Sequence, residues 1–296
     1  VRYTFEISEK REERIKWKYF QYLSLLFTEI YLDRYFHQRE QLLNDLNGLI
    51  EEFNKELPKK EQLSPSPYKE ADLRKLAFWN ATGSGKTLLM HVNIKQYQHY
   101  FYKNHRQDEL GQIILLTPSE DLSIQHLREF EKSGIQAVLF DKKQDGLFRG
   151  KEVSIIDIHK IKDEAGEKTV AIDTFEGNNL VLVDEGHRGS SGEDWKTKRE
   201  KLSEQGFAFE YSATFGQAVS KKKELIDEYS KCILFDYSYR YFHADGYGKE
   251  YRILNLENDK DESIRHLYLT SCLLSFYQQM KIYMDNEVAY RPFLLE

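Results

Sequence analysis

The sequence predicts an α/β fold built on a mostly parallel sheet, and three features of the chain indicate it. Short apolar runs, expected to be strands, alternate with helix-like stretches between residues 73 and 235. The first of these runs ends in a glycine-rich turn that leads directly into a helix. A later run ends in two adjacent carboxylates, Asp184 and Glu185. Because open parallel sheets bind ligands at the carboxyl ends of their strands, we expect both features to form one site.

Composition limits the classes of protein to which the chain can belong. Its 296 residues suffice for one large or two modest domains, with 40% hydrophobic residues to fill a core. The formal net charge of -6 argues against a globally basic nucleic-acid binder, although a local groove can still be positive. Cys232 and Cys272 support neither a disulfide framework nor a zinc site. Without a signal peptide or a stretch long enough for a membrane span, the expected location is cytoplasmic.

The glycine-rich turn has the residue types of a phosphate-binding loop. Its glycines let the backbone N–H groups point at phosphate oxygens, and the following helix directs its positive end to the same place. We expect Lys86 to contact the β- and γ-phosphates of ATP and Thr87 to place its hydroxyl on Mg²⁺. An ordinary helix-initiating turn is the alternative, since Ser and Thr cap helices and Gly permits the bend. The loop consists of Ala81, Thr82, Gly83, Ser84, Gly85, Lys86 and Thr87.

The carboxylate pair supplies the other half of the expected chemistry. Asp184 is placed to hold Mg²⁺, directly or through water, on the opposite side of the metal from Thr87. Glu185 is then the candidate for orienting or deprotonating the attacking water. A solvated surface turn is the alternative, and the apolar run at 180–183 disfavours it.

Hydrophobic periodicity and turn residues predict the remaining elements. A long helix-like region covers Glu13 to Glu56, with Gly48 as a weak point, and Pro58 lies in the loop that ends it. The region 237–251 stays unassigned. Expected strands are 73–79, 112–117, 137–140, 153–156, 180–183, 206–211 and 231–235, and expected helices are 87–102, 120–132 and 264–284.

Four of these segments resemble, in order, motifs of superfamily-2 helicases. The loop from Ala81 to Thr87 resembles motif I, which in that family starts from the alanine, so that Asn80 in place of a glycine is no obstacle. Asp184-Glu185-Gly186-His187 resembles motif II, the DExH form of the DEAD/DEAH box, and Ser212-Ala213-Thr214 resembles motif III. The closest branch looks like the helicase subunits of type III restriction enzymes and related phage-defence helicases. The segment that resembles motif Ia contains Thr117, Pro118, Ser119, Leu122 and Gln125.

The resemblance implies a RecA-like domain that hydrolyses ATP with Mg²⁺ and moves along nucleic acid, with DNA as the expected track. It implies that His187, Ser212 and Thr214 couple the nucleotide state to nucleic-acid binding, although each can equally cap a turn or a helix. Partner subunits of a defence or restriction complex are expected, and no membrane. An ATP-binding switch that senses nucleic acid without moving and a P-loop phosphotransferase for a small molecule are the alternatives. The implied nucleic-acid contacts are Thr117, Pro118, Ser119 and Gln125.

Two positions depart from the family pattern. Asp157 stands where the family usually has threonine, and a carboxylate there would repel a phosphate backbone. The adenine-reading glutamine of the family normally lies closer to motif I than Gln21, the best candidate in this chain. Gln21 can serve only if residues 33–75 form a helical insertion, and otherwise it is a polar helix residue.

The expected organisation follows from where the motifs lie. It comprises a helical N-terminal segment or insertion over 1–67, the first RecA-like domain over 68–242, and a linker with a helix over 243–290. A second RecA-like domain is expected to begin at 291–296, and nothing in the chain matches the arginine finger that the family carries there. Because the chain starts at Val1 rather than Met and stops where a strand begins, we expect a fragment. Without the arginine finger of a second domain, we expect it to be nearly inactive alone.

Overall fold

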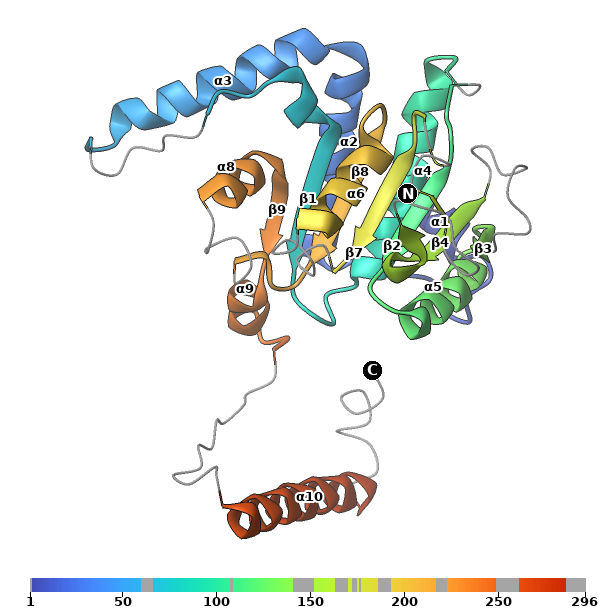
Figure 1. Cartoon of the computed structure of the whole chain (residues 1–296), viewed down its shortest axis with the longest axis vertical. Helices are drawn as coiled ribbons and strands as arrows, with labels where there is room; N and C mark the ends of the chain where they lie inside the picture. The colour runs from blue at the N-terminus through green and yellow to red at the C-terminus, as the bar shows by residue number, and fades with distance from the viewer. Residues whose placement is uncertain are drawn as a thin grey trace. The chain divides into compact units, whose positions relative to one another are not determined.

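A parallel sheet forms the centre of the structure, which is a computed structural model of the chain (Figure 1). The chain divides into two units, Val1–Tyr247 and Gly248–Glu296, and the sheet belongs to the first. The described part of the second unit contains the helix α10 (Glu262–Asp285). The structure describes residues 2–59, 66–106, 109–140, 152–162, 170–171, 175, 177–185, 193–216, 223–248 and 261–285.

The strands of the sheet are β1 (Lys75–Asn80), β2 (Ile113–Thr117), β3 (Ala137–Leu139), β4 (Val153–Asp157), β7 (Leu180–Asp184), β8 (Phe207–Ser212) and β9 (Ile233–Tyr237). They lie in the order β3-β4-β2-β7-β8-β1-β9, and each neighbouring pair runs parallel. The predicted α/β fold with a mostly parallel sheet is therefore confirmed. Two short strands that were not predicted, β5 (Ile161–Lys162) and β6 (Val170–Ala171), pair separately.

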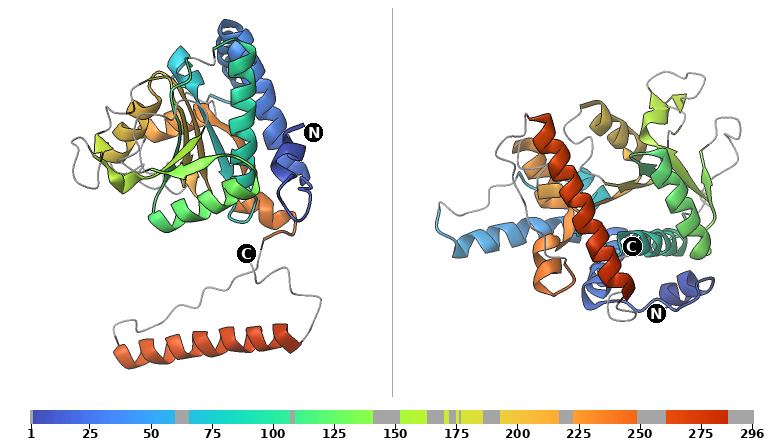
Figure 2. Two further views of the ribbon diagram at one scale, coloured as in Figure 1. Left: turned by 90° about the vertical axis from the view of Figure 1, so that its right-hand side faces the viewer. Right: turned by 90° about the horizontal axis from the view of Figure 1, so that it is seen from below.

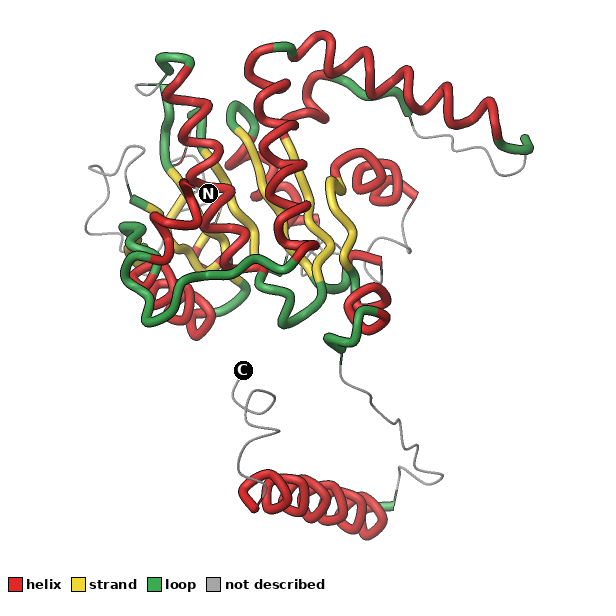
Figure 3. Tube along the Cα trace, turned by 180° about the vertical axis from the view of Figure 1, so that it is seen from behind, coloured by secondary structure: helices red, strands yellow, loops and turns green. Residues whose placement is uncertain are grey.

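The helices of the first unit are α1 (Arg2–Ser8), α2 (Tyr19–His37), α3 (Arg39–Glu56), α4 (Lys86–Lys103), α5 (Glu120–Lys132), α6 (Glu193–Ser203), α8 (Lys223–Cys232) and α9 (Tyr239–Ala244), with 3-10 turns η1 (Glu70–Arg74) and η3 (Ile158–Lys160). They cover both faces of the sheet (Figure 2). Figure 3 shows α2 and α4 lying side by side over one face. Side chains of a strand alternate between faces, so Phe207 and Phe209 of β8 pack in the cluster that includes these helices. Val181 and Val183 of β7 point the other way and pack with Leu202 of α6.

The N-terminal helical region differs from its prediction. Residues 9–18 are not helical, so the predicted helix from Glu13 starts too early, and the chain breaks again at Gln38. There the backbone has φ -142° and ψ 42°, outside the helical region. The break separates a helix that is largely buried from one that is largely not. α2 buries seven side chains, whereas α3 buries Leu42 among its described residues. Consequently α3 projects beyond the sheet in Figure 1, and it continues unbroken through Gly48.

Smaller differences occur at the C-terminal end of the sheet. The predicted strand over 231–235 begins two residues later, at Ile233, because α8 continues through Cys232. The unassigned stretch after Tyr237 contains α9. The N-terminal segment predicted over 1–67 lies in the same unit as the sheet. The predicted start of a second domain at 291–296 lies outside the described residues.

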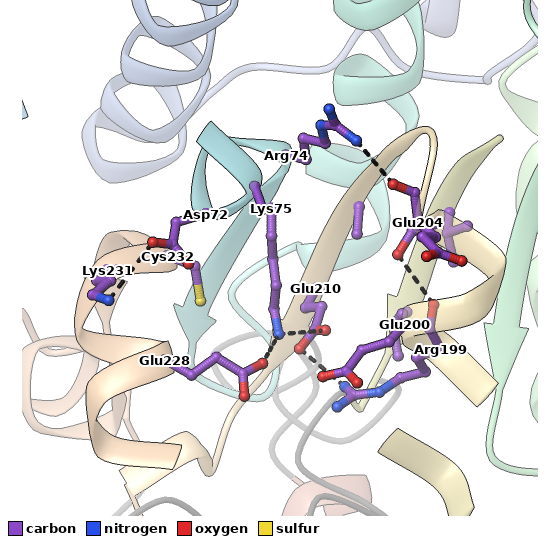
Figure 4. Close-up of a pocket in the computed structure, with 15 residues that line it drawn as sticks. Asp72, Arg74, Lys75, Arg199, Glu200, Glu204, Glu210, Glu228, Lys231 and Cys232 are labelled. Atoms are coloured by element: carbon purple, nitrogen blue, oxygen red, sulfur yellow. Dashed lines mark hydrogen bonds and ion pairs between the residues drawn. The ribbon is translucent and has the colours of Figure 1, made fainter. Parts of the chain in front are cut away.

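A buried ion-pair network joins β1, β8, α6 and α8 on the face opposite α4 (Figure 4). The Glu210 carboxylate lies 3.0 Å from Lys75 Nζ and 3.0 Å from Arg199 Nη1, and it accepts a hydrogen bond of 2.7 Å from the Tyr229 hydroxyl. Lys75 also pairs with Glu228. Burial alone would raise the pKa of Glu210, but the charges of Arg199 and Lys75 outweigh it and lower that pKa below its ordinary value. The four charged side chains line a pocket of about 410 Å³ towards the amino end of β1, away from the glycine-rich loop.

Replacing Glu210 by Gln should lower the free energy of unfolding by about 3 kcal/mol or more, because the charge that neutralises the buried Arg199 and the half-buried Lys75 is lost. Urea unfolding measures this change, with an unchanged m-value as the sign that the denatured state is the same. The control is Arg2→Gln, which breaks the exposed Arg2–Glu6 pair at 3.0 Å and should cost less than about 1 kcal/mol. Similar costs for both substitutions would contradict a structural role for the network.

Candidate nucleotide-binding site

The predicted site residues converge at the carboxyl edge of the sheet. In the sheet, β8 lies between β7 and β1. Asp184 at the end of β7 is opposite Tyr211, and Ser212 at the end of β8 is opposite Trp79. The loop that follows β1, the carboxylate pair after β7 and the segment after β8 therefore leave three adjacent strands at the same edge, as parallel pairing requires.

The loop after β1 has the backbone of a phosphate-binding turn. Gly83 and Gly85 have φ of 80° and 88°, values at which a side chain would be strained. Gly85 is also the residue that precedes α4, so no Ser or Thr side chain caps this helix. Capping by Ser or Thr therefore does not explain this helix start, whereas glycine does permit the bend. Thr82 and Gly83 are exposed, whereas Ala81 and Ser84 are buried.

The lysine of the loop lies beside the carboxylate pair. Lys86 Nζ is 3.4 Å from the Asn80 carbonyl oxygen and 4.0 Å from Glu185 Oε1. Glu185 has φ of 54°, in the left-handed region that residues other than glycine seldom occupy. Backbone strain of this kind is concentrated at functional sites. Thr87 follows in the first turn of α4 and is half-buried.

Asp184 is held at both of its oxygens. Its Oδ1 accepts the Glu185 backbone N–H at 3.0 Å, and its Oδ2 lies 2.9 Å from His126 Nε2. Burial raises the pKa of Asp184, but the His126 hydrogen bond and the nearby positive charge of Lys86 outweigh it, so that this pKa lies below its ordinary value. Asp184 is therefore an ionised carboxylate, able to bind a cation.

The residues present fit ATP with Mg²⁺. Buried polar atoms gather around the loop, and within the described residues Ser84 Oγ, Thr214 Oγ1 and the Asn80 side-chain amide have no hydrogen-bond partner. The described ranges also contain no group of three His, Cys, Asp or Glu side chains arranged as a metal site. Mg²⁺ needs no such group, because it is usually held by one or two protein oxygens together with substrate phosphates and water. Thr87 and Asp184 are the residues that would hold it.

Gln21 lies against the loop, although it is 63 residues away in the sequence from Ser84. Its Nε2 donates to the Ser84 carbonyl oxygen at 2.8 Å, and its Oε1 accepts from the Lys18 N–H at 2.9 Å. A Cβ added at Gly85 would lie 2.5 Å from Gln21 Nε2, so the contact needs glycine there. Between residues 33 and 75 the described chain contains the end of α2, all of α3 and η1. The contact with adenine stays a prediction.

The segment after β8 forms a compact turn. Ser212 is buried, and its Oγ accepts the Thr214 N–H at 3.0 Å. Trp79 of β1 donates its Nε1 to the Ala213 carbonyl oxygen at 3.0 Å. The turn is thus fastened to the strand that carries the phosphate loop. The coupling roles of Ser212 and Thr214 stay predictions, and His187 lies outside the described residues.

The predicted nucleic-acid residues of motif Ia differ in exposure. Thr117 is buried, and its hydroxyl lies 2.6 Å from Ser123 Oγ. Ser119 caps α5 by accepting the Leu122 N–H at 3.4 Å. Gln125 is exposed, and Pro118 is half-buried. Contacts of these residues with nucleic acid stay predictions.

Two residues have roles that the sequence did not predict, Asp157 and His126. The Asp157 carboxylate accepts the His159 N–H at 2.9 Å and so caps η3, which gives this carboxylate a local structural role. His126 was not predicted as a site residue. Helical spacing was the available signal, because Ser123, His126 and Phe130 recur on the face that α5 buries.

None of the helices in the described ranges has the length and apolar character needed to cross a membrane.

A comparison with curated proteins finds no match. Two solved structures are similar in part. The Sulfolobus solfataricus SWI2/SNF2 ATPase core in complex with dsDNA is 14% identical, with a TM-score of 0.32, over 57% of this chain and 34% of that one. T4 UvsW is 14% identical, with a TM-score of 0.38, over 64% of this chain and 38% of that one. The matches thus span little more than a third of either known chain.

A family model gives the identification. The model described as "Type III restriction enzyme, res subunit" matches residues 37–217, more than half of the chain. The matched range contains the phosphate loop, the carboxylate pair and the segment from Ser212 to Thr214. The chain therefore belongs to the family of type III restriction enzyme Res subunits, and it carries a superfamily-2 helicase-type ATPase domain, the first RecA-like domain that the motifs resembled.

Proposed function

We propose that this chain is the motor domain of an ATP-dependent helicase or translocase, which acts on DNA in the cytoplasm with partner subunits of a restriction or phage-defence system. One observation carries the proposal. Lys86 Nζ lies 4.0 Å from Glu185 Oε1, at the edge where Asp184 ends its strand. A cation for the phosphates, a ligand for a metal ion and a base for water are thus within reach of one triphosphate.

Each residue has a definite role in the proposed reaction. The loop N–H groups and Lys86 bind and orient the phosphates. Thr87 and Asp184 would hold Mg²⁺, which would supply positive charge to the phosphates when bound. Glu185 orients the attacking water and takes its proton, while the bond between the γ-phosphorus and the bridging oxygen to ADP breaks in line. Family membership supports nucleic acid as the track, because Res subunits are parts of restriction enzymes.

The proposal includes near-inactivity of this polypeptide alone. Lys86, Thr87, Asp184 and Glu185 all approach the nucleotide from one domain. An arginine finger from a second domain typically contributes a factor of about 10³ to 10⁵ in related nucleotide hydrolases, so its absence outweighs the other contributions. Nucleic acid should not restore turnover, because closing two domains on the nucleotide requires both of them.

Lys86→Ala should abolish measurable ATP binding, because the substitution removes the positive charge that faces the phosphates and leaves the loop backbone intact. Titration of the folded variant with a fluorescent ATP analogue measures the affinity. The matched control is Lys103→Ala, an exposed lysine in the last turn of the same helix, which should bind like the parent. Equal affinities of parent and Lys86→Ala would rule out the phosphate loop as the nucleotide site.

Turnover tests the motor assignment. Phosphate release should be barely detectable for this chain with or without DNA, and DNA should stimulate it strongly in an extended protein that also contains a second RecA-like domain. In the extended protein Glu185→Gln should retain ATP affinity and lower turnover by about 10²-fold or more, the range of general acid–base groups. Glu120→Gln, an exposed carboxylate on α5, is the control.

Four outcomes would contradict the proposal. Strong DNA-stimulated turnover by the short chain would show that a positive group within it completes the site. Unchanged turnover in both Asp184→Asn and Glu185→Gln would leave the carboxylate pair as a surface turn. DNA-stimulated turnover without displacement along labelled DNA would favour the switch over the motor, and turnover that depends on a small-molecule acceptor would favour a phosphotransferase.

A further inference from the structure

We propose that His126 is a positioning residue, which fixes the orientation of the Asp184 carboxylate for Mg²⁺. The inference rests on the proposed function, since it assigns a supporting group to the metal ligand of that site. His126 comes from the middle of α5 and Asp184 from the end of β7, 58 residues apart in the sequence. Their side chains are only 5% and 12% exposed, and His126 Nε2 lies 2.9 Å from Asp184 Oδ2.

Chemistry fixes the direction of this hydrogen bond. An ionised carboxylate can only accept, so His126 must carry a proton on Nε2 and donate it to Oδ2. The other ring nitrogen, Nδ1, is buried and has no hydrogen-bond partner within the described residues. The hydrogen bonding of this ring is therefore directed to Asp184.

Two donors on two different oxygens determine the plane of the carboxylate. The Glu185 N–H reaches Oδ1 at 3.0 Å, and His126 reaches Oδ2 at 2.9 Å. Rotation about the Cβ–Cγ bond would break both hydrogen bonds, whereas the backbone donor alone would restrain only one oxygen. Each oxygen keeps a second lone pair for a cation. Hydrogen bonds to a ligating carboxylate commonly tune metal affinity by about 10- to 100-fold.

The surroundings of His126 keep the ring in place. Its ring lies 6.4 Å from that of Phe130 on the buried face of α5, and Phe130 stacks on His91 of α4 at 4.4 Å. His91 belongs to the same buried group but bonds elsewhere, with its Nδ1 2.8 Å from Ser133 Oγ. His91→Ala therefore serves as a control, because it disturbs the same buried group of rings and leaves the contact between His126 and Asp184 in place.

The test measures how Mg²⁺ changes the affinity of this chain for fluorescent ADP, in His126→Gln, His126→Asn and His126→Ala. A glutamine amide nitrogen can take the position of Nε2, whereas the shorter asparagine reaches only to that of Nδ1. The measured quantity is the Mg²⁺ concentration that produces half of the change in ADP affinity. We expect His126→Ala and His126→Asn to raise this concentration by about 10-fold or more, and His126→Gln to keep it near the parent value. In EDTA all three variants should bind ADP like the parent, which also verifies that they are folded.

The outcomes separate this inference from the function on which it rests. A parent that binds ADP without any effect of Mg²⁺ would overturn both, since there would be no metal ion to position a ligand for. A Mg²⁺ effect in the parent that is the same in all His126 variants would overturn the positioning role alone. The positioning role would also be overturned if His126→Gln and His126→Asn had the same Mg²⁺ dependence. It would be overturned as well if His91→Ala shifted the Mg²⁺ dependence as much as His126→Ala.

Discussion

The parallel pairing of β8 with both β1 and β7 determines where the site lies. Because the three strands run in the same direction, the loop after Asn80, the turn after Ser212 and the carboxylates after Val183 emerge together. The distance of 4.0 Å between Lys86 Nζ and Glu185 Oε1 is a consequence of this pairing, although the residues are 99 positions apart by their numbers. The glycines of the loop and the strained Glu185 are local adjustments to that arrangement.

Two buried carboxylates of this domain illustrate how surroundings separate structure from chemistry. Glu210 pairs with Arg199 and Lys75, so its negative charge is neutralised by cations of the same domain. Asp184 instead receives N–H donors from His126 and its own backbone neighbour, which orient the carboxylate and leave lone pairs available. Both have lowered pKa values, because Arg199 and Lys75 outweigh the effect of burial at Glu210, and His126 and Lys86 outweigh it at Asp184. A lowered pKa alone would not have distinguished the structural group from the site residue.

The sequence predicted the parts of the fold that local patterns encode. Apolar runs and turn residues predicted the sheet, and α5 was predicted with the bounds observed, because Ser119 and the charged last turn mark its ends. Contacts between distant segments left no such pattern. The approach of Gln21 to Ser84, the bond from His126 to Asp184 and the Glu210 network all depend on tertiary packing. The helix predicted from Glu13 was too long, since residues 9–18 are not helical and the chain breaks at Gln38.

If the loop and the carboxylate pair form one site around one metal ion, Thr87 and Asp184 should act together, and a double-mutant cycle measures whether they do. The quantity to measure is the gain in affinity for a slowly hydrolysed ATP analogue on adding Mg²⁺, in the parent, Thr87→Ala, Asp184→Asn and the double variant. If both residues hold the same ion, the double variant should lose clearly less than the sum of the single losses, with an interaction energy above about 0.5 kcal/mol. Losses that add to within about 0.3 kcal/mol would mean that the two residues act at independent places, which would contradict a shared metal site.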